Sequence, residues 1–281
     1  MRYNEILEKK VLGERIVSFR IYSPEIARRS LPGQFVVVRI HEKGERIPLT
    51  LCDWDGREGW IRLVVQEVGK STYQMGDMEE GEIVPDILGP LGKPADIDSA
   101  GRVVCVGGGV GTAELFPIAR AYKEKGNFVI GIMGFRSSRQ VILEEELNSV
   151  LDTFVLTTED GSRGREGLVT EPLEEILRGN EINLVYAVGP IPMMKAVSEL
   201  TKKFEVRTLV SLNPIMVDGT GMCGSCRVTV GGKVRFSCVD GPEFDGHQVD
   251  FEELMLRNQR FQEEERRALK IYLEGKEGRS G

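Results

Sequence analysis

Histidine is nearly absent from this sequence, since His41 and His247 are the two examples among 281 residues. His41 lies in a polar stretch, and His247 follows Asp245-Gly246. Both are expected to be surface or supporting groups. Histidine is the usual general base and the central member of a Ser-His-Asp triad. We therefore predict neither histidine-based acid–base catalysis nor a catalytic triad, and we assign no catalytic side chain.

Other absences narrow the class of protein further. No apolar run reaches the roughly 18–20 residues that a membrane-spanning helix needs, and the first residues, MRYNEILEKK, lack a signal-peptide core. The formal net charge of −7 gives no hint of the basic face that nucleic acids require. Three of the five cysteines fall in one motif, which favours metal ligation in a reducing compartment over disulfides. We predict a cytoplasmic protein that binds neither nucleic acid nor membrane.

The clustered cysteines form the most informative pattern of the chain. Asp218, Cys223, Cys226 and Cys238 follow the spacing D-x4-C-x2-C-x11-C, which is the plant-type [2Fe–2S] spacing with an aspartate in the first cysteine's place. Intervening glycines allow backbone N–H groups to approach the sulfur atoms. These four side chains are the predicted metal ligands. A Cys3Asp zinc site is the alternative, because C-x2-C pairs also bind zinc.

The rest of the chain divides by its hydrophobic patterning. Residues 1–97 combine short β-rich runs with Gly/Pro turns, which predicts a small antiparallel barrel. Residues 98–212 alternate buried strands with amphipathic helices, which predicts a doubly wound parallel sheet. Residues 213–250 are poor in apolar side chains and are expected to need their metal to fold. The predicted fold class is thus α/β plus all-β.

The C-terminal tail, residues 251–281, is predicted as one charged amphipathic helix extending to about residue 274. Its apolar residues are Phe251, Leu254, Leu256 and Phe261. We expect this helix to cover the domain or to meet a partner.

A glycine loop follows the first strand of the central region, between Val103–Val106 and a helical stretch. The candidate nucleotide-binding residues there are Gly107, Gly108, Gly109, Gly111 and Thr112. Backbone N–H groups and the helix N-terminus at such a loop hold a pyrophosphate. The acidic residue of a standard dinucleotide unit is missing, because the region after the second strand reads Gly134-Phe135-Arg136-Ser137. The alternative is a loop that serves only tight strand–helix packing.

A second glycine turn, Gly189-Pro190, follows the last clear strand and starts a helix. It lies at the carboxyl end of its strand, where ligands bind in sheets of this kind. It is the second candidate nucleotide-binding element.

Four further motifs carry a resemblance to a known family. They are Pro32-Gly33-Gln34-Phe35, Arg46-Ile47-Pro48-Leu49-Thr50, Gly69-Lys70-Ser71-Thr72 and Leu88-Gly89-Pro90-Leu91-Gly92. With the order of barrel, nucleotide sheet and iron–sulfur segment, they resemble the ferredoxin–NADP reductase superfamily. Within it, the chain looks like the small (alpha) subunits of NADH-dependent ferredoxin:NADP oxidoreductase, also described as sulfide dehydrogenase subunit beta. It is also similar to the electron-transfer subunits of dihydroorotate dehydrogenase. Those subunits carry four cysteines at the cluster, whereas this chain has three cysteines and Asp218.

The resemblance implies two sets of cofactor-binding residues. Arg46, Pro48, Leu49 and Thr50 would hold the flavin ring of FAD, and Gly69, Lys70, Ser71 and Thr72 its pyrophosphate. An ordinary polar turn is the alternative for the second segment. The glycine loop, Asp160 and Gly189-Pro190 would bind the nicotinamide nucleotide. The resemblance favours NAD(H), whereas Arg136 with Ser137 and Arg139 can receive the 2′-phosphate of NADP(H).

The function implied is hydride exchange between NAD(P)H and FAD, followed by single-electron transfer through a [2Fe–2S] cluster. The partner implied is a larger flavin and iron–sulfur subunit in a heterodimer, and the resemblance includes electron-bifurcating oxidoreductases. Two alternatives stay within the enzyme class: an electron-transfer subunit of dihydroorotate dehydrogenase, and a reductase that acts without a second subunit. From another class, the chain could be a zinc-binding scaffold without redox activity, whose glycine loops are only turns.

Overall fold

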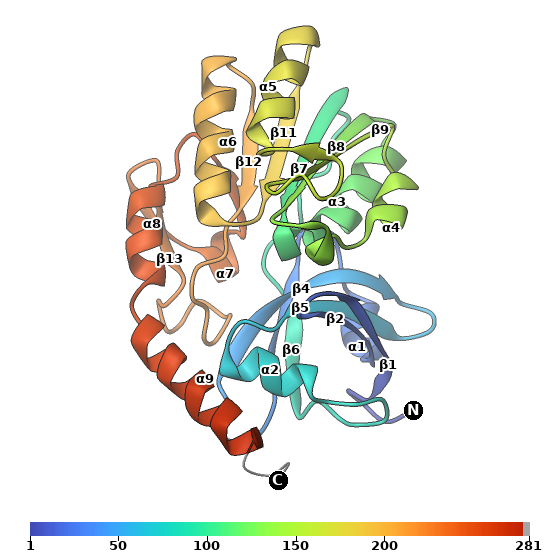
Figure 1. The fold of residues 1–281 in the computed structure, drawn as a ribbon, viewed down its shortest axis with the longest axis vertical. Helices are drawn as coiled ribbons and strands as arrows, with labels where there is room; N and C mark the ends of the chain where they lie inside the picture. The colour runs from blue at the N-terminus through green and yellow to red at the C-terminus, as the bar shows by residue number, and fades with distance from the viewer. Residues whose placement is uncertain (278–281) are drawn as a thin grey trace.

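The computed structural model describes residues 1–277 (Figure 1). The N-terminal part is an antiparallel sheet with the strand order β1-β2-β5-β4-β3-β6. Its strands are β1 (Ile6–Gly13), β2 (Ile16–Tyr22), β3 (Phe35–Arg39), β4 (Arg46–Asp55), β5 (Trp60–Gln66) and β6 (Asp86–Leu91). The inward side chains form one apolar core, in which Phe19, Ile61 and Leu63 are fully buried. The predicted antiparallel barrel is confirmed.

Two short helices accompany the barrel, α1 (Pro24–Ala27) and α2 (Lys70–Gly76). Gly69 is the N-cap residue of α2. The Thr72 hydroxyl accepts hydrogen bonds from the backbone N–H groups of Val68 and Gly69 at 3.0 and 2.9 Å. These bonds satisfy donors that a helix start would otherwise leave unpaired. They fix the segment that was predicted to bind the flavin pyrophosphate.

The central part is a mostly parallel sheet with the order β10-β9-β8-β7-β11-β12-β15. Its strands are β7 (Arg102–Gly108), β8 (Phe128–Phe135), β9 (Thr153–Thr158), β10 (Arg165–Glu166), β11 (Leu184–Val188), β12 (Thr208–Ser211) and β15 (Glu243–Asp245). The chain steps from β7 to β9 in one direction and then returns to place β11 and β12 on the other side of β7. The switch point between β7 and β11 is where such sheets bind ligands. The predicted doubly wound sheet is confirmed.

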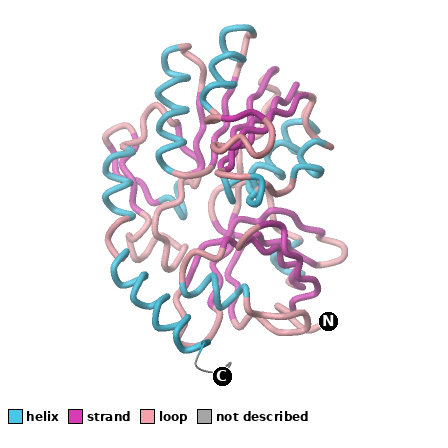
Figure 2. The backbone as a smooth tube through the Cα atoms, in the orientation of Figure 1, coloured by secondary structure: helices cyan, strands magenta, loops and turns pink. Residues whose placement is uncertain are grey.

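Helices cover both faces of this sheet (Figure 2). They are α3 (Thr112–Glu124) and α4 (Glu144–Asn148) on one face, and α5 (Thr170–Gly179) and α6 (Ile191–Lys203) on the other, with 3₁₀ turns at Gly109–Gly111 and Ser138–Gln140. Leu115 and Leu147 belong to the core of the first face, and Leu173 and Met194 to that of the second. Two packed layers therefore hold the parallel strands rigidly in place.

Ion pairs join the barrel to the nucleotide domain, and Arg62 of β5 forms one of them with Glu146 of α4 at 3.4 Å. Arg120 of α3 donates to Asp53 of β4 at 2.9 Å, and its guanidinium lies 5.0 Å from the Phe116 ring centroid. Partial burial makes such a pair stronger than an exposed one. It holds the two parts in register on either side of the space between them.

The glycine- and cysteine-rich segment contributes β13 (Arg227–Val230), β14 (Lys233–Phe236), α7 (Ser237–Asp240) and β15. β13 and β14 form a hairpin, whereas β15 pairs antiparallel with β12. The segment therefore adds the edge strand of the nucleotide sheet. It also packs on the barrel, because Cys226 and Cys238 share a buried cluster with Phe35 and Val37 of β3.

The prediction of a single C-terminal helix was wrong. The tail forms α8 (Phe251–Asn258) and α9 (Gln262–Glu277), which pack against different parts of the molecule (Figure 1). Phe251 and Leu254 of α8 are buried in the core of the nucleotide sheet. α9 runs along the barrel beside α2, where Tyr272 and Lys276 contact Asp77. The chain turns between these two docking sites.

Two of the four apolar residues predicted for the tail helix are exposed. Leu256 and Phe261 are 67% and 50% exposed, so they do not belong to a buried helix face. Residues 278–281 of the predicted tail lie outside the described residues. None of the helices within residues 1–277 has the length and apolarity that crossing a membrane requires.

Candidate cofactor and cluster site

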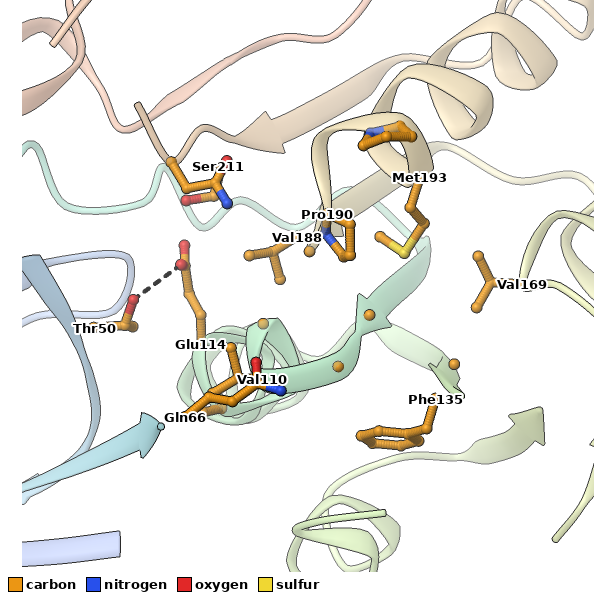
Figure 3. Close-up of a pocket in the computed structure, with 18 of the residues that line it drawn as sticks. Thr50, Gln66, Val110, Glu114, Phe135, Val169, Val188, Pro190, Met193 and Ser211 are labelled. Carbon is orange, nitrogen blue, oxygen red and sulfur yellow. Dashed lines mark hydrogen bonds between the residues drawn. The ribbon is translucent and has the colours of Figure 1, made fainter. Parts of the chain in front are cut away.

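A cavity of about 800 Å³ lies between the barrel and the carboxyl edge of the nucleotide sheet. Its walls come from β4 and β5 of the barrel, from the loops after β7, β8 and β11, and from the chain after β12. Figure 3 shows side chains from these separate segments converging on one space. The cavity sits at the switch point of the sheet and has room for a dinucleotide-sized ligand.

The barrel wall contains most of the predicted flavin contacts. Pro48, Leu49 and Thr50 line the cavity from β4, whereas Arg46 is exposed at the start of the strand and does not line it. From the α2 segment, Thr72 lines the cavity, and Gly69, Lys70 and Ser71 do not. The Ser71 hydroxyl instead donates to Glu45 at 2.8 Å.

The glycine loop after β7 forms the opposite wall. Gly108, Gly109 and Gly111 line the cavity, whereas Gly107 lies behind them. A Cβ atom at Gly111 would stand 2.8 Å from the Val188 carbonyl oxygen and 2.9 Å from Gly189 Cα. The loop therefore needs glycine where it touches the turn after β11.

Thr112 begins α3 directly after this loop. Its hydroxyl is fully buried and has no hydrogen-bond partner among residues 1–277. A buried hydroxyl without a partner is uncommon in proteins. Thr112 does not line the cavity, so its hydroxyl does not face the proposed nucleotide site.

The nicotinamide side contains some of the predicted residues. Gly189 and Pro190 line the cavity with Met193 of α6, and Arg136 lines it after β8 (Figure 3). Asp160 does not line it, because its carboxylate accepts hydrogen bonds from the backbone and hydroxyl of Ser162.

Sequence reasoning missed Glu114, a buried carboxyl group in the first turn of α3. Its oxygens accept hydrogen bonds from the hydroxyls of Thr50 and Tyr186, both at 3.2 Å. Burial raises the pKa of Glu114, and hydrogen bonds from Ser211, Tyr186 and Thr50 oppose that rise. An acidic residue within an otherwise apolar helix start was the signal that could have identified it.

The cluster loop brings together two of the four predicted ligands. Cys226 and Cys238 are buried, and their Sγ atoms lie 3.2 Å apart. Two thiolates on one tetrahedral metal, each about 2.3 Å from it, are about 3.8 Å apart. The two sulfur atoms therefore need to move apart only slightly to act as two ligands of one iron.

Backbone N–H groups point at the sulfur atoms of this loop. Cys238 N–H donates to Cys226 Sγ at 3.5 Å, and Ser225 N–H donates to Cys223 Sγ at 3.4 Å. Positive φ angles at Gly219, Gly221 and Gly224, between 66° and 86°, produce the tight turns. Such donors stabilise thiolate ligands and tune an iron–sulfur cluster.

Asp218 lies at the start of the same loop. Its two carboxylate oxygens accept the backbone N–H groups of Thr220 and Cys223 at 2.7 and 2.6 Å. These hydrogen bonds hold the pKa of Asp218 below its ordinary value, and the bond from Thr220 has the largest effect. The group is thus an anion whose remaining lone pairs can bind a metal.

The four side chains do not all converge in this conformation. Cys223 is exposed, and within residues 1–277 no group of three or more His, Cys, Asp or Glu side chains stands in metal-binding geometry. The buried thiol pair, the N–H groups aimed at sulfur and the anionic carboxylate nevertheless fit an iron–sulfur cluster. Closure of the exposed part of the loop would complete the set.

Comparison with known proteins agrees with this geometry. Residues 213–250 match the model of the iron-sulfur cluster binding domain of dihydroorotate dehydrogenase B, and residues 105–199 match that of the oxidoreductase NAD-binding domain. The chain is 46% identical over 270 residues to a Thermotoga maritima protein named "Dihydroorotate dehydrogenase B (NAD(+)), electron transfer subunit homolog", covering 96% of this chain and 95% of that protein. The chain belongs to the family of dihydroorotate dehydrogenase B electron-transfer subunits.

Two further relatives place the chain within this family. A Geobacillus thermodenitrificans protein named as the electron transfer subunit of dihydroorotate dehydrogenase B is 32% identical, over 87% of this chain and 96% of its own length. A solved chain superimposes with a TM-score of 0.93 at 45% identity, covering 97% of this chain and 99% of its own length. Its structure is described as that of NADH-dependent reduced ferredoxin-NADP oxidoreductase, in a study of flavin-based electron bifurcation.

These matches confirm the family resemblance and the expected kind of function. The chain is an NAD(P)H-dependent oxidoreductase subunit of the electron-transfer type, with a flavin-binding fold, a nicotinamide-binding domain and an iron–sulfur segment. The alternative of a zinc-binding scaffold without redox activity is not supported.

Proposed function

We propose that the chain exchanges a hydride between NAD(H) and FAD and passes single electrons through a [2Fe–2S] cluster to or from a larger subunit. In this proposal residues 1–97 bind FAD, residues 98–212 bind the nicotinamide nucleotide, and residues 213–250 hold the cluster. Residues 251–281 form the tail. When bound, the flavin supplies hydride acceptance and one-electron release, and the cluster supplies one-electron transfer.

The observation that carries the proposal is the thin wall between the cavity and the cysteine pair. Phe35 and Met216 line the cavity, and both also pack in the buried cluster that contains Cys226 and Cys238. A flavin ring against this wall would lie one side-chain layer from the iron ligands. Such proximity is what one-electron transfer between two cofactors requires.

In this proposal the two walls of the cavity bind different cofactors. Pro48, Leu49 and Thr50 offer an apolar surface and one hydroxyl to the flavin ring, and Thr72 lines the cavity from α2. The loop Gly108–Gly111 and the start of α3 would hold the pyrophosphate of the nicotinamide nucleotide. Asp218, Cys223, Cys226 and Cys238 are the proposed ligands of the cluster. The remaining predicted contacts, Arg46, Gly69, Lys70, Ser71 and Asp160, stay proposals that need a bound cofactor to be tested.

The proposed nicotinamide substrate is NADH. The solved relative with 45% identity is described as NADH-dependent. Arg136 lines the cavity and is able to bind a 2′-phosphate, which makes NADPH the second candidate. Faster flavin reduction by NADPH than by NADH would overturn this preference.

A larger subunit is the proposed electron partner. The surface around the cluster loop exposes Met222, Val217 and Val239, at 88%, 43% and 40%. Apolar side chains gathered beside a redox centre are typical of a protein-binding surface. Bifurcation requires a second flavin and further clusters, which we assign to that subunit. A cytoplasmic location accords with cysteines that ligate metal rather than form disulfides.

A second candidate function is electron transfer to a dihydroorotate dehydrogenase. The names of the Thermotoga maritima and Geobacillus thermodenitrificans relatives favour it. Purification from the native cell separates the two, because the co-purifying subunit would carry either one dihydroorotate site or additional iron–sulfur clusters. Recovery of no second subunit would favour a reductase that acts alone.

The proposal is tested by anaerobic titration of the reconstituted chain with NADH and, separately, NADPH. We expect NADH to bleach the flavin absorbance and then to produce the paramagnetic signal of a reduced [2Fe–2S] cluster. Metal analysis should find iron and sulfide. A colourless protein that contains zinc would overturn the proposal.

A further inference from the structure

Two glutamates lie beside the cavity and are not needed to bind any of the proposed cofactors. Glu114 is buried, and Glu243 is half-buried with one buried carboxyl oxygen. Glu114 comes from α3, and Glu243 is the first residue of β15 in the cluster segment. Tyr186 of β11 lies between them, and its hydroxyl donates to Glu114 at 3.2 Å. One oxygen of Glu243 is buried without a hydrogen-bond partner in the described part of the chain. Buried carboxyl groups are rare unless they are paired or functional.

Glu114 is connected directly to the cavity wall. The Thr50 hydroxyl donates to Glu114 Oε2, and Figure 3 shows the carboxylate directed at Thr50, with Ser211 close by. Thr50, Glu114 and Ser211 all line the cavity. The flavin side of the cavity is thus joined by hydrogen bonds to a buried acid.

Hydroxyl and carboxyl groups lie around the two glutamates, and Arg207 acts on the neighbouring Tyr122. Glu114 faces the hydroxyls of Thr50, Tyr186 and Ser211, which come from β4, β11 and β12. Glu243 faces Tyr186, Glu114 and Asp96, and it also influences Tyr122 of α3. Burial raises the pKa of Glu243 to about 7, and Glu114 contributes to that rise. Burial therefore raises the pKa of both carboxyl groups and favours their protonated forms.

We propose that Glu114 is the proton acceptor and donor of the flavin site, acting through Thr50, and that Tyr186 and Glu243 extend it into a buried proton store. This inference rests on the proposed function, because it concerns the proton of a bound flavin. It adds a role for residues that no cofactor contact requires.

The proton balance explains why such an acceptor is needed. A hydride brings one proton and two electrons to the flavin together, so this step needs no acid or base. When the two electrons leave one at a time toward the cluster, the proton stays behind. Thr50 accepts that proton as a flavin N–H bond breaks, and its own hydroxyl proton forms an O–H bond at Glu114 Oε2. In the reverse direction Glu114 returns the proton through the same hydroxyl.

The test compares the two half-reactions in the parent, Glu114→Gln and Glu243→Gln. Glutamine keeps the size of glutamate and one acceptor oxygen, replaces the other oxygen with an N–H₂ donor, and cannot take up a proton. We expect Glu114→Gln to affect hydride transfer from NADH much less than the later loss of electrons from the flavin. Loss of electrons from the photochemically reduced flavin to ferricyanide should slow about 10²-fold, with a changed solvent isotope effect, since general acid–base groups contribute roughly that much. Glu243→Gln should show the same change to a smaller degree.

A second readout does not depend on turnover. The infrared difference spectrum between reduced and oxidised protein should contain a protonated-carboxyl band in the parent that is absent in Glu114→Gln. The control is Glu199→Gln, an exposed glutamate of α6 that should behave as the parent. Circular dichroism establishes that each variant is folded, and Tyr186→Phe, which removes only one hydroxyl, is the second probe of the same path.

The outcomes separate this inference from the proposed function. Unchanged oxidation rates, isotope effect and infrared band in Glu114→Gln would overturn the inference, whatever NADH does. Failure of NADH to reduce the parent flavin would overturn the proposed function, while the photochemically reduced flavin still tests the glutamates. A parent chain that retains no flavin would overturn both.

Discussion

The Sγ atoms of Cys226 and Cys238 lie 3.2 Å apart, although 12 residues separate them in the sequence. The hairpin of β13 and β14 returns the chain to this point, because Arg227 pairs with Phe236 at its open end. Phe35 and Met216, which line the cavity, pack in the same buried cluster as this cysteine pair.

Replacing either residue of this cysteine pair should abolish the cluster. We expect Cys226→Ser and Cys238→Ser to lose nearly all bound iron, because serine is a poor ligand for iron in a sulfur-rich site. Iron analysis and visible absorbance measure the loss. Cys52→Ala is the control, since Cys52 is buried in the core of the nucleotide sheet and should leave iron content unchanged. Full iron content in Cys238→Ser would remove that residue from the ligand set.

Asp218 should be a ligand that cysteine can replace and alanine cannot. We expect Asp218→Cys to keep its cluster with a changed reduction potential, because thiolate is a softer ligand than carboxylate. Asp218→Ala should bind iron less tightly by about 10-fold or more. Spectroelectrochemical titration and EPR compare the three proteins. Cluster spectra in Asp218→Ala that match the parent would show that the aspartate only caps its loop.

Gly111 should be required for nucleotide binding. A methyl group there would stand 2.8 Å from the Val188 carbonyl oxygen. This oxygen belongs to the backbone, which cannot easily move away. We expect Gly111→Ala to lower the free energy of unfolding by about 1–3 kcal/mol and to weaken NADH binding by about 10-fold. Urea unfolding and NADH titration measure the two effects. Gly179→Ala is the matched control, because nothing lies within 4 Å of its Cβ position; an equal effect in both variants would refute the explanation.

Glu243 should make stability depend on pH in a definite direction. Burial disfavours the charged form and raises the pKa of Glu243 from its ordinary 4.5 to about 7 in the folded chain. Between these values the folded state binds more protons than the unfolded state, so stability falls as pH rises. The loss is at most about 3 kcal/mol, at 1.36 kcal/mol for each pKa unit.

Urea unfolding at a series of pH values tests this dependence in the parent and in Glu243→Gln. We expect the variant to show a flatter stability profile between pH 4.5 and about 7. A parallel profile in the two proteins would contradict the assignment. Glu199→Gln should keep the slope of the parent, because that side chain is exposed.

Local patterns were sufficient for the architecture and insufficient for the contacts between its parts. Alternation in the first 97 residues predicted a barrel, and strands alternating with helices predicted the parallel sheet, because both signals are periodic along the chain. The pairing of β15 with β12 joins residues far apart in sequence. No local pattern encodes such a pairing.

The site shows the same division between local and long-range information. The glycine loop, Pro48–Thr50 and the cysteine spacing were recognisable because their chemistry depends on neighbours in sequence. Glu114 was missed because its role depends on hydrogen bonds from Thr50 and Tyr186, which lie on strands distant in the sequence. The tail was predicted as one helix because an amphipathic pattern does not reveal that α8 and α9 dock on different surfaces.

The central claim is that electrons entering as a hydride leave singly through the cysteine pair. The most direct measurement mixes NADH rapidly and anaerobically with the reconstituted parent and with Cys238→Ser, following flavin absorbance and the cluster EPR signal. The account predicts flavin bleaching in both proteins and a reduced-cluster signal in the parent alone. A cluster signal of equal size and rate in Cys238→Ser, or a parent whose flavin NADH does not bleach, would contradict it.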